Sequence, residues 1–264
     1  MSKYSSIIIN TWNEILTYRL SFVMWRLRTI FQLLTIYFLW HSLIPKSQTL
    51  FGYSQSVMLT YIVGTAVLSA IVFSTRTHEI GENINSGNLS SFLTKPISYF
   101  GYWFCRDIGD KLMNISFSII ELFILFFILR PSLFIQTNIE YLLFFLIAIV
   151  FGVLLYFLIG AMLGMIGFWS PEVWAPRFIF FILVQFFSGA LFPLDIFPKP
   201  IFALFQFLPF PYLLFFPLKI YLGQISFAEI AQGLTVTMVW IFVLWHGVAL
   251  VWQKGLRMYT AYGN

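Results

Sequence analysis

Apolar residues fill long stretches of the chain, and polar residues gather in the segments between them. Six stretches are long enough to cross a bilayer as helices, since about 20 helical residues span the hydrocarbon core. The pattern therefore predicts an all-α integral membrane protein with six transmembrane helices. We expect these helices at residues 22–43, 57–73, 112–129, 141–169, 174–192 and 234–252.

The N-terminal segment has a different periodicity. Tyr4, Ile8, Trp12 and Ile15 fall on one helical face, with polar residues largely opposite. An amphipathic helix of this kind lies in the membrane interface, with its Trp and Tyr at headgroup depth. We therefore expect an interfacial helix over residues 1–20, and the alternative is a lead-in helix packed on the protein.

The segment between residues 194 and 222 is apolar, but prolines interrupt it too often for an ordinary spanning helix. Broken backbone at membrane depth is tolerated only where neighbouring helices bury it or a watery cavity meets it. Such a segment is typical of a translocation machine. The prolines that we assign to it are Pro193, Pro198, Pro209, Pro211 and Pro217.

Composition narrows the class of protein further. Sixty per cent of the residues are hydrophobic and 9% are charged, with a mean hydropathy of +0.88. A soluble domain has about a quarter of its residues charged. The spans leave no room for a separate soluble catalytic domain, so residues 1–264 are interpreted as a single transmembrane domain.

Lys and Arg are distributed unequally between the two sides of the predicted spans. Eleven of the fifteen fall on one side, and Lys46, Arg130, Lys199 and Lys219 fall on the other. Basic residues are enriched in cytoplasmic loops, so the first side, which includes both termini, is expected to be cytoplasmic. The net charge of +5 follows from this topology, and no nucleic-acid partner is needed to explain it.

A polar loop over residues 77–98 connects the second and third spans on the cytoplasmic side. Its spacing predicts a short helix that ends at Gly87 and a second turn capped by Ser90. Apolar residues on a cytoplasmic loop favour docking to another subunit, and packing on this chain's own helix ends is the alternative. The residues assigned to docking are Glu79, Ile80, Glu82, Ile84, Leu89, Phe92, Leu93 and Pro96, with the two glutamates expected to be solvated.

Glu121 is the one carboxylate expected inside the membrane. A buried carboxylate is costly unless it is paired, hydrated or protonated, so it should face the protein interior. Asn114 and Ser118 lie on the same helix, and His246 on the sixth span is a conceivable partner. These four residues are candidates for a substrate path, although a structural hydrogen bond is favoured for His246.

Other chemistry is not indicated. Gly81 to Gly87 is followed by Asn88 rather than by the lysine of a phosphate-binding loop. The histidines are scattered, which predicts no metal site, and no nucleophile is accompanied by a base. On the fourth span, Gly160 and Gly164 favour close helix packing within the chain.

The loop and the broken segment together resemble ABC-2-type transporter permeases over nearly the whole chain. The residues that carry the resemblance are Ile84, Gly87, Leu89, Leu93, Pro96 and Ile97, together with segments 187–193, 208–212 and 217–223. It implies an elbow helix over residues 1–20, a coupling helix near residues 78–86, and a re-entrant helical hairpin over 194–222 on the outer side, between helices 5 and 6. Glu79 and Glu82 depart from the more arginine-rich loops of many relatives.

The resemblance also implies partners and a function. Two permease chains, identical or homologous, form the path in the lipid bilayer, and separate ATP-binding cassette ATPase subunits hold ATP and Mg, with no cofactor in this chain. The expected function is a permease that exports a hydrophobic or amphipathic substrate across the bacterial cytoplasmic membrane. A passive channel or ion-coupled carrier without an ATPase is the alternative, and a non-transporting scaffold is a third possibility.

Overall fold

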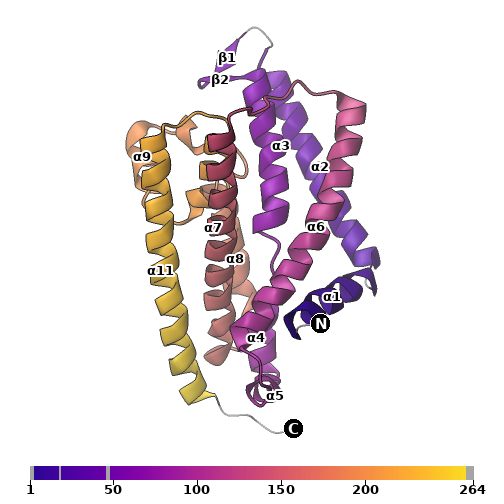
Figure 1. The fold of residues 1–264 in the computed structure, drawn as a ribbon, viewed down its shortest axis with the longest axis vertical. Coiled ribbons are helices and arrows are strands. Elements are labelled where there is room, and N and C mark those ends of the chain that lie inside the picture. The colour runs from indigo at the N-terminus through magenta and orange to yellow at the C-terminus, as the bar shows by residue number, and fades with distance from the viewer. Residues whose placement is uncertain (1–2, 18, 46–47, 260–264) are drawn as a thin grey trace.

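The structure is a computed structural model that describes residues 3–17, 19–45 and 48–259. Long helices run between the two ends of the molecule, and a two-stranded β-hairpin lies at one end (Figure 1). The elements are α1 (Lys3–Thr17), α2 (Arg19–Leu43), β1 (Thr49–Leu50), β2 (Tyr53–Ser54), α3 (Gln55–Val72), α4 (His78–Asn85), α5 (Leu89–Leu93), α6 (Tyr99–Leu129), α7 (Ile139–Gly164), η1 (Met165–Phe168), α8 (Trp174–Phe187), η2 (Leu194–Ile196), α9 (Lys199–Phe205), η3 (Phe210–Tyr212), α10 (Phe215–Tyr221) and α11 (Phe227–Met258).

Five helices are long and apolar enough to cross a membrane, so the chain is an all-α membrane protein. They are α2, α3, α6, α7 continued by η1, and α11. The fifth expected span, at residues 174–192, corresponds to α8, a helix of 14 residues. At 1.5 Å per residue α8 is about 21 Å long, which is shorter than the hydrocarbon core of about 30 Å.

Two helices extend beyond the spans expected from hydropathy. Helix α6 begins at Tyr99 rather than near residue 112, and hydropathy missed this part because residues 106–111 include four charged side chains, of which Arg106 pairs with α1 and α4. Helix α11 begins at Phe227, where Ser226 and Glu229 form a capping box. Hydropathy marked the lipid-facing part of each helix and missed the polar ends.

Helix α1 packs across α6. Thr11 and Ile15 are buried, and a Cβ at Gly109 of α6 would come within 3.0 Å of the Ile8 carbonyl oxygen. Gly109 thus allows the two backbones to approach closely. Residues 1–2 and 18 of the expected elbow, and Lys46, lie outside the described residues. Helix α1 and the C-terminal end of α11 lie at the end of the bundle opposite the β-hairpin (Figure 1).

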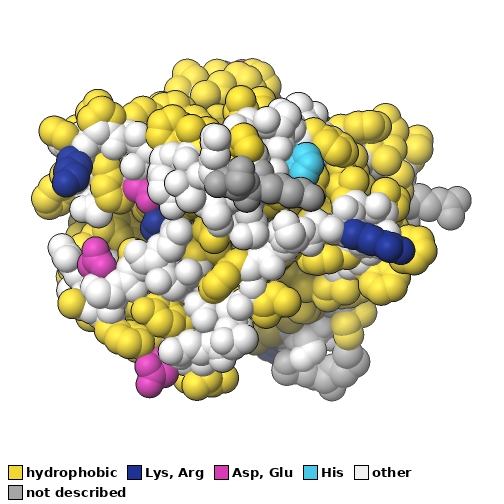
Figure 2. Space-filling model, turned by 90° about the horizontal axis from the view of Figure 1, so that it is seen from above, with side chains coloured by type: hydrophobic (Ala, Val, Ile, Leu, Met, Phe, Trp, Pro, Cys, Tyr) yellow, Lys and Arg dark blue, Asp and Glu magenta, His cyan; other side chains and the backbone are white. Residues whose placement is uncertain are grey.

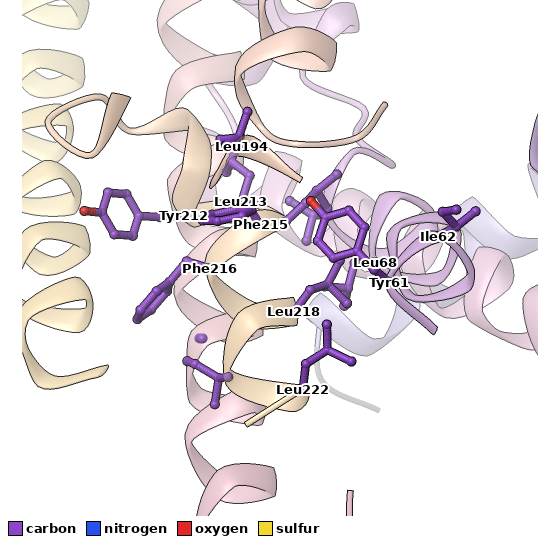
Figure 3. Close-up of a cluster of buried hydrophobic side chains, with 14 of the residues drawn as sticks. Tyr61, Ile62, Leu68, Leu194, Tyr212, Leu213, Phe215, Phe216, Leu218 and Leu222 are labelled. Carbon is purple, nitrogen blue, oxygen red and sulfur yellow. The ribbon is translucent and has the colours of Figure 1, made fainter. Parts of the chain in front are cut away.

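The second half of the broken segment, residues 209–222, is largely buried in the bundle, whereas α9 is mostly exposed. The short helices begin at or near prolines. Pro193 and Pro198 precede η2 and α9, and Pro217 lies in the first turn of α10. Every residue from Phe215 to Ile220 is buried, and Phe215 and Leu218 lie on the side of α10 that faces Tyr61 and Leu68 of α3 (Figure 3). The backbone of this part is held by protein, as broken backbone in a membrane must be.

The outer surface of the helices is apolar. Ile120, Phe123 and Phe127 on α6 are exposed, as are Ile179 and Ile182 on α8. Viewed from the hairpin end, apolar side chains form much of the rim of the molecule (Figure 2). This distribution is the one expected of helices that face lipid.

Candidate functional site

The loop between α3 and α6 folds into α4 and α5 at the end of the bundle that carries α1 (Figure 1). Gly87 follows α4 with a φ of 76°, a left-handed conformation that glycine adopts without strain. Asn88, rather than Ser90, occupies the cap position of α5. The Ser90 hydroxyl instead donates to the Gly87 carbonyl at 2.7 Å.

Ile80, Ile84 and Leu89 do not form the exposed surface that we expected. Their exposed fractions are 0%, 4% and 0%, and they lie in a core with Leu158 and Met165. The expectation that these three side chains contact a partner is therefore wrong for this structure. They pack against this chain's own helices instead, as in the alternative interpretation.

A groove on α7 explains why α4 packs inward. A Cβ at Gly164 would lie 2.8 Å from the Ile80 Cβ, and one at Gly160 would clash with the Thr77 hydroxyl. The two glycines therefore leave the space that α4 occupies, and the close packing expected of Gly160 and Gly164 is confirmed. Because this packing is tight, α4 is held against the membrane-spanning bundle.

The opposite side of α4 and α5 remains open, and we call it the outer face. Leu93 is 50% exposed on this side, while Phe92 is half-buried and its ring contacts those of Tyr99 and Tyr102. The surface available to a partner is thus mostly polar, with Leu93 and Pro96 as its apolar side chains. The outer face comprises Glu82, Asn85, Ser86, Asn88, Ser91, Leu93, Thr94, Lys95 and Pro96.

Glu79 is half-buried in an ion-pair cluster rather than solvated. It pairs with Arg76 at 3.0 Å and with Arg106 of α6 at 3.1 Å. Glu14 of α1 pairs with the same two arginines, at 3.7 Å and 2.5 Å. Burial lowers the pKa of Arg76, but Asp110 and the two glutamates outweigh it, so the pKa is raised. The cluster joins α1, α4 and α6.

A second polar layer fixes the turn between α3 and α4. Asp107 of α6 accepts hydrogen bonds from the Thr75 hydroxyl and the Arg76 amide, both at 2.7 Å. Lys111 donates to the carbonyl oxygens of Val72 and Ser74 at the end of α3. A lysine there satisfies carbonyls that the helix leaves free, so α6 holds the turn in place.

Glu121 is paired with Arg26 of α2, which is 5% exposed. The Arg26 Nε donates to Glu121 Oε1 at 2.6 Å, and its Nη1 and Nη2 donate to Asn114 at 3.3 Å and Ser118 at 3.0 Å. Three of the four expected substrate-path residues therefore meet around one guanidinium. The Arg26 guanidinium is directed at these partners on α6.

His246 is not part of this cluster. Its Nδ1 is 2.9 Å from the Phe242 carbonyl oxygen on its own helix, and the residue is exposed. The backbone hydrogen bond favoured from the sequence is present, and pairing with Glu121 is not.

A third polar cluster lies at the hairpin end. Lys219 of α10 donates to Asp195 at 2.7 Å, to the Tyr53 hydroxyl at 3.1 Å and to Gln224 at 2.6 Å. The Tyr53 hydroxyl also donates to Asp195 at 2.8 Å. Burial, with the Asp195 charge adding to it, raises the pKa of Tyr53, so the phenol stays protonated. The cluster ties the broken segment to the β-hairpin.

Two cavities flank the Arg26 cluster. One, of about 200 Å³, lies among α2, α3, α6 and α8 and is lined in part by Arg26 and Glu121. The other, of about 470 Å³, lies toward α1 and is lined in part by Glu14 and Asn114. Trp25, Phe73 and Ser74 line both cavities.

Sequence reasoning missed Arg26 as a partner of Glu121, and Lys219 with Asp195 and Tyr53. A charged residue within or beside an apolar stretch indicates that it needs a partner. The sequence does not identify that partner, because the paired residues are far apart along the chain. Within the ranges that the structure describes, no three His, Cys, Asp or Glu side chains form a group that could hold a metal ion.

Comparison with known families gives one match. The sequence model described as ABC-2 family transporter protein matches residues 30–263, which include all the elements from α3 to α11. No curated protein matches the chain.

Proposed function

The chain belongs to the ABC-2 family of transporter proteins and is a membrane permease component of an ABC transporter, and from this premise we propose that it exports a hydrophobic or amphipathic substrate. The proposed path forms between two permease chains, identical or homologous, in the bacterial cytoplasmic membrane. Separate ATPase subunits bind ATP and Mg and drive the cycle. Both termini are cytoplasmic in this proposal, with α8 as a sixth, shorter span and segment 194–222 re-entering from outside.

The observation that carries the proposal is the position of α4. This helix is packed into the α7 groove and joined by an ion pair to α6, and it is linked to Glu14 of α1 through the two arginines that both glutamates share, while its outer face is open. A partner that pushes on the outer face moves three elements together, because tightly packed contacts transmit displacement. We therefore assign docking to the outer face, with Glu82, Leu93 and Pro96, and assign Ile80, Ile84 and Leu89 to anchoring α4.

The second permease chain is proposed to cover the side of the bundle formed by α2 and α8. Helix α8 has one fully buried residue, Val184, and its remaining surface is open or half-open. Gln32 on α2 and Gln185 on α8 are polar side chains on the same side of the bundle, where both line one cavity. Polar groups at membrane depth are costly against lipid, which supports a protein or cavity on this side.

Purification of the tagged full chain in a mild detergent, followed by mass spectrometry, tests the proposal. A stoichiometric ATPase and a second permease chain in the complex are the expected result. Recovery of the chain without any ATPase, while it conducts ions or moves substrate along an ion gradient, would replace the proposal with a channel or an ion-coupled carrier.

A further inference from the structure

The cavity of about 200 Å³ among α2, α3, α6 and α8 combines an apolar wall with polar groups. Its apolar side is formed by residues such as Leu33, Ile36, Ile62 and Phe181. Its polar side is formed by Arg26, Arg28, Gln32, Ser69, Glu121 and Gln185. A site with this division suits a molecule with an apolar body and a polar head.

The polar residues lie within the membrane-spanning part of the helices. The apolar span of α2 begins at Phe22. At 1.5 Å per residue, Arg28 lies about 9 Å and Gln32 about 15 Å along it. On α8, Gln185 lies about 16 Å from the first residue, Trp174. An unpaired amide at this depth is costly unless water or a ligand meets it.

The charges in the cavity do not balance. Arg26 is neutralised by Glu121, which accepts two of its hydrogen bonds. Arg28 has no carboxylate partner among residues 3–17, 19–45 and 48–259, and it is exposed to the cavity side of α2. One positive charge thus remains for a ligand.

Uncharged hydrogen-bonding groups line the same cavity as this charge. The side chains of Gln32, Ser69 and Gln185 have no hydrogen-bond partner in the part of the chain that the structure describes. They come from three different helices and face one cavity. Three free groups beside one free guanidinium favour a polar head with several oxygen atoms.

We propose that this cavity binds the anionic head of an amphipathic molecule, a carboxylate or a phosphate, with Arg28 as the residue that recognises the charge. The planar guanidinium fits both oxyanions, and the apolar chain lies along Leu33, Ile36 and Phe181. The inference rests on the proposed export of an amphipathic substrate and names the class of that substrate.

Equilibrium binding to the purified full chain in phosphatidylcholine nanodiscs tests this site. The probes are oleate, which carries a carboxylate, dioleoyl phosphatidate, which carries a phosphate, and monoolein, which is neutral. Binding of either anionic probe is expected, and the stronger one identifies the head group. Arg28→Gln should weaken that binding about tenfold, because a charge-assisted hydrogen bond is lost, and should leave monoolein unchanged.

Two further variants separate a binding role from a general effect. Arg257→Gln removes an exposed arginine on α11, away from the cavity, and should leave binding unchanged. Gln185→Leu should weaken binding of the anionic probe several-fold. If Gln185 faced only lipid or the second permease, this change would leave probe binding intact. Arg28→Gln with binding within twofold of wild type, or an equal loss of monoolein, would overturn the proposal.

The same preparations keep this inference distinct from the proposed function. If the Arg28→Gln variant binds both anionic probes normally and also retains its ATPase, the site assignment fails and the permease assignment stands. If the wild-type chain binds an anionic probe through Arg28 but has no ATPase, the site stands and ATP-driven export fails.

Discussion

Arg26 and Glu121 form a bidentate ion pair between α2 and α6, although they are 95 positions apart in the sequence, and Arg26 Nε lies 2.6 Å from Glu121 Oε1. The side chain of Arg26 is 7% exposed and that of Glu121 is 23% exposed. Asn114 and Ser118 supply further acceptors, so nearly every donor of the guanidinium is used. The pair fixes α2 against α6 beside both cavities.

Breaking this pair from one side should destabilise the protein. Arg26→Gln or Glu121→Gln leaves one buried charge without its partner, at a cost of about 3–5 kcal/mol. The double change Arg26→Leu with Glu121→Leu should recover most of that loss. Thermal unfolding of each variant in the same detergent measures the effect, and single variants as stable as wild type would show that the pair is not structural.

The packing of α4 on α7 gives a second prediction. Gly164→Ala places a methyl group against the Ile80 Cβ and the Thr77 carbonyl oxygen, at 2.8 Å and 2.9 Å, so α4 must shift. Overpacking of this kind costs about 1–3 kcal/mol. Gly247→Ala is the matched control, because its nearest neighbour, the Met162 sulfur, would be 3.5 Å away. Thermal unfolding should separate the two variants, and equal melting temperatures would contradict the tight groove.

The polar cluster at the hairpin end gives a third prediction. Lys219→Met removes the hydrogen bonds to Asp195, Tyr53 and Gln224 and should cost about 1.5–3 kcal/mol, the usual loss for bonds to a charged group. Lys199→Met removes an exposed lysine of the same segment and should be neutral. Thermal unfolding checks both, and a neutral Lys219→Met would mean that the cluster contributes nothing to stability.

Five of the six expected spans and the interruption by prolines could be predicted from the sequence because each depends on local composition. The apolar span of α2 begins and ends where hydropathy placed it, and the prolines lie where the short helices begin. Helix α6 was predicted too short because residues 106–111 are mostly charged. Two of these charges, Arg106 and Asp110, are paired with Glu14 and Arg76, which lie far away in the sequence.

The orientation of α4 could not be predicted for a similar reason. Ile80 and Ile84 share one helical face, and a shared face is compatible with burial in this chain or in a partner. Gly160 and Gly164 decide between the two, because they form the groove that accepts Ile80. Only the fold brings these residues together. The Arg26–Glu121 pair was missed because pairing across helices has no sequence pattern.

A pH effect is expected at His78. Burial lowers the pKa of His78, and the nearby charges of Arg177 and Arg76 lower it further, while Glu79 opposes them. The imidazole therefore takes up its proton at a lower pH in the folded protein than in the unfolded chain, where it does so below about pH 6.5. Because the unfolded state binds more protons, stability should fall as the pH drops below that value.

His78→Gln should remove this contribution to the pH dependence of stability. The melting temperature of wild type should fall more steeply between pH 7.5 and pH 5.5 than that of the variant, with both in the same detergent. Other groups that titrate in this range are common to the two proteins and cancel in the difference. Parallel curves would show that His78 does not contribute to the pH dependence.

Substitutions on the outer face of α4 and α5 should affect ATPase binding, whereas substitutions on the buried side of these helices should affect folding. Leu93 is 50% exposed, so Leu93→Asp should leave the melting temperature unchanged and lower the amount of copurified ATPase about tenfold, as for a well-packed contact residue. Ile80→Asp buries a charge in the core and should prevent stable folding. Lys254→Glu changes an exposed charge at the same end, outside the outer face, and should affect neither quantity. If Leu93→Asp retains the full amount of ATPase, the ATPase docks elsewhere on the chain, and the anchored α4 is then a structural element rather than the point where force is received.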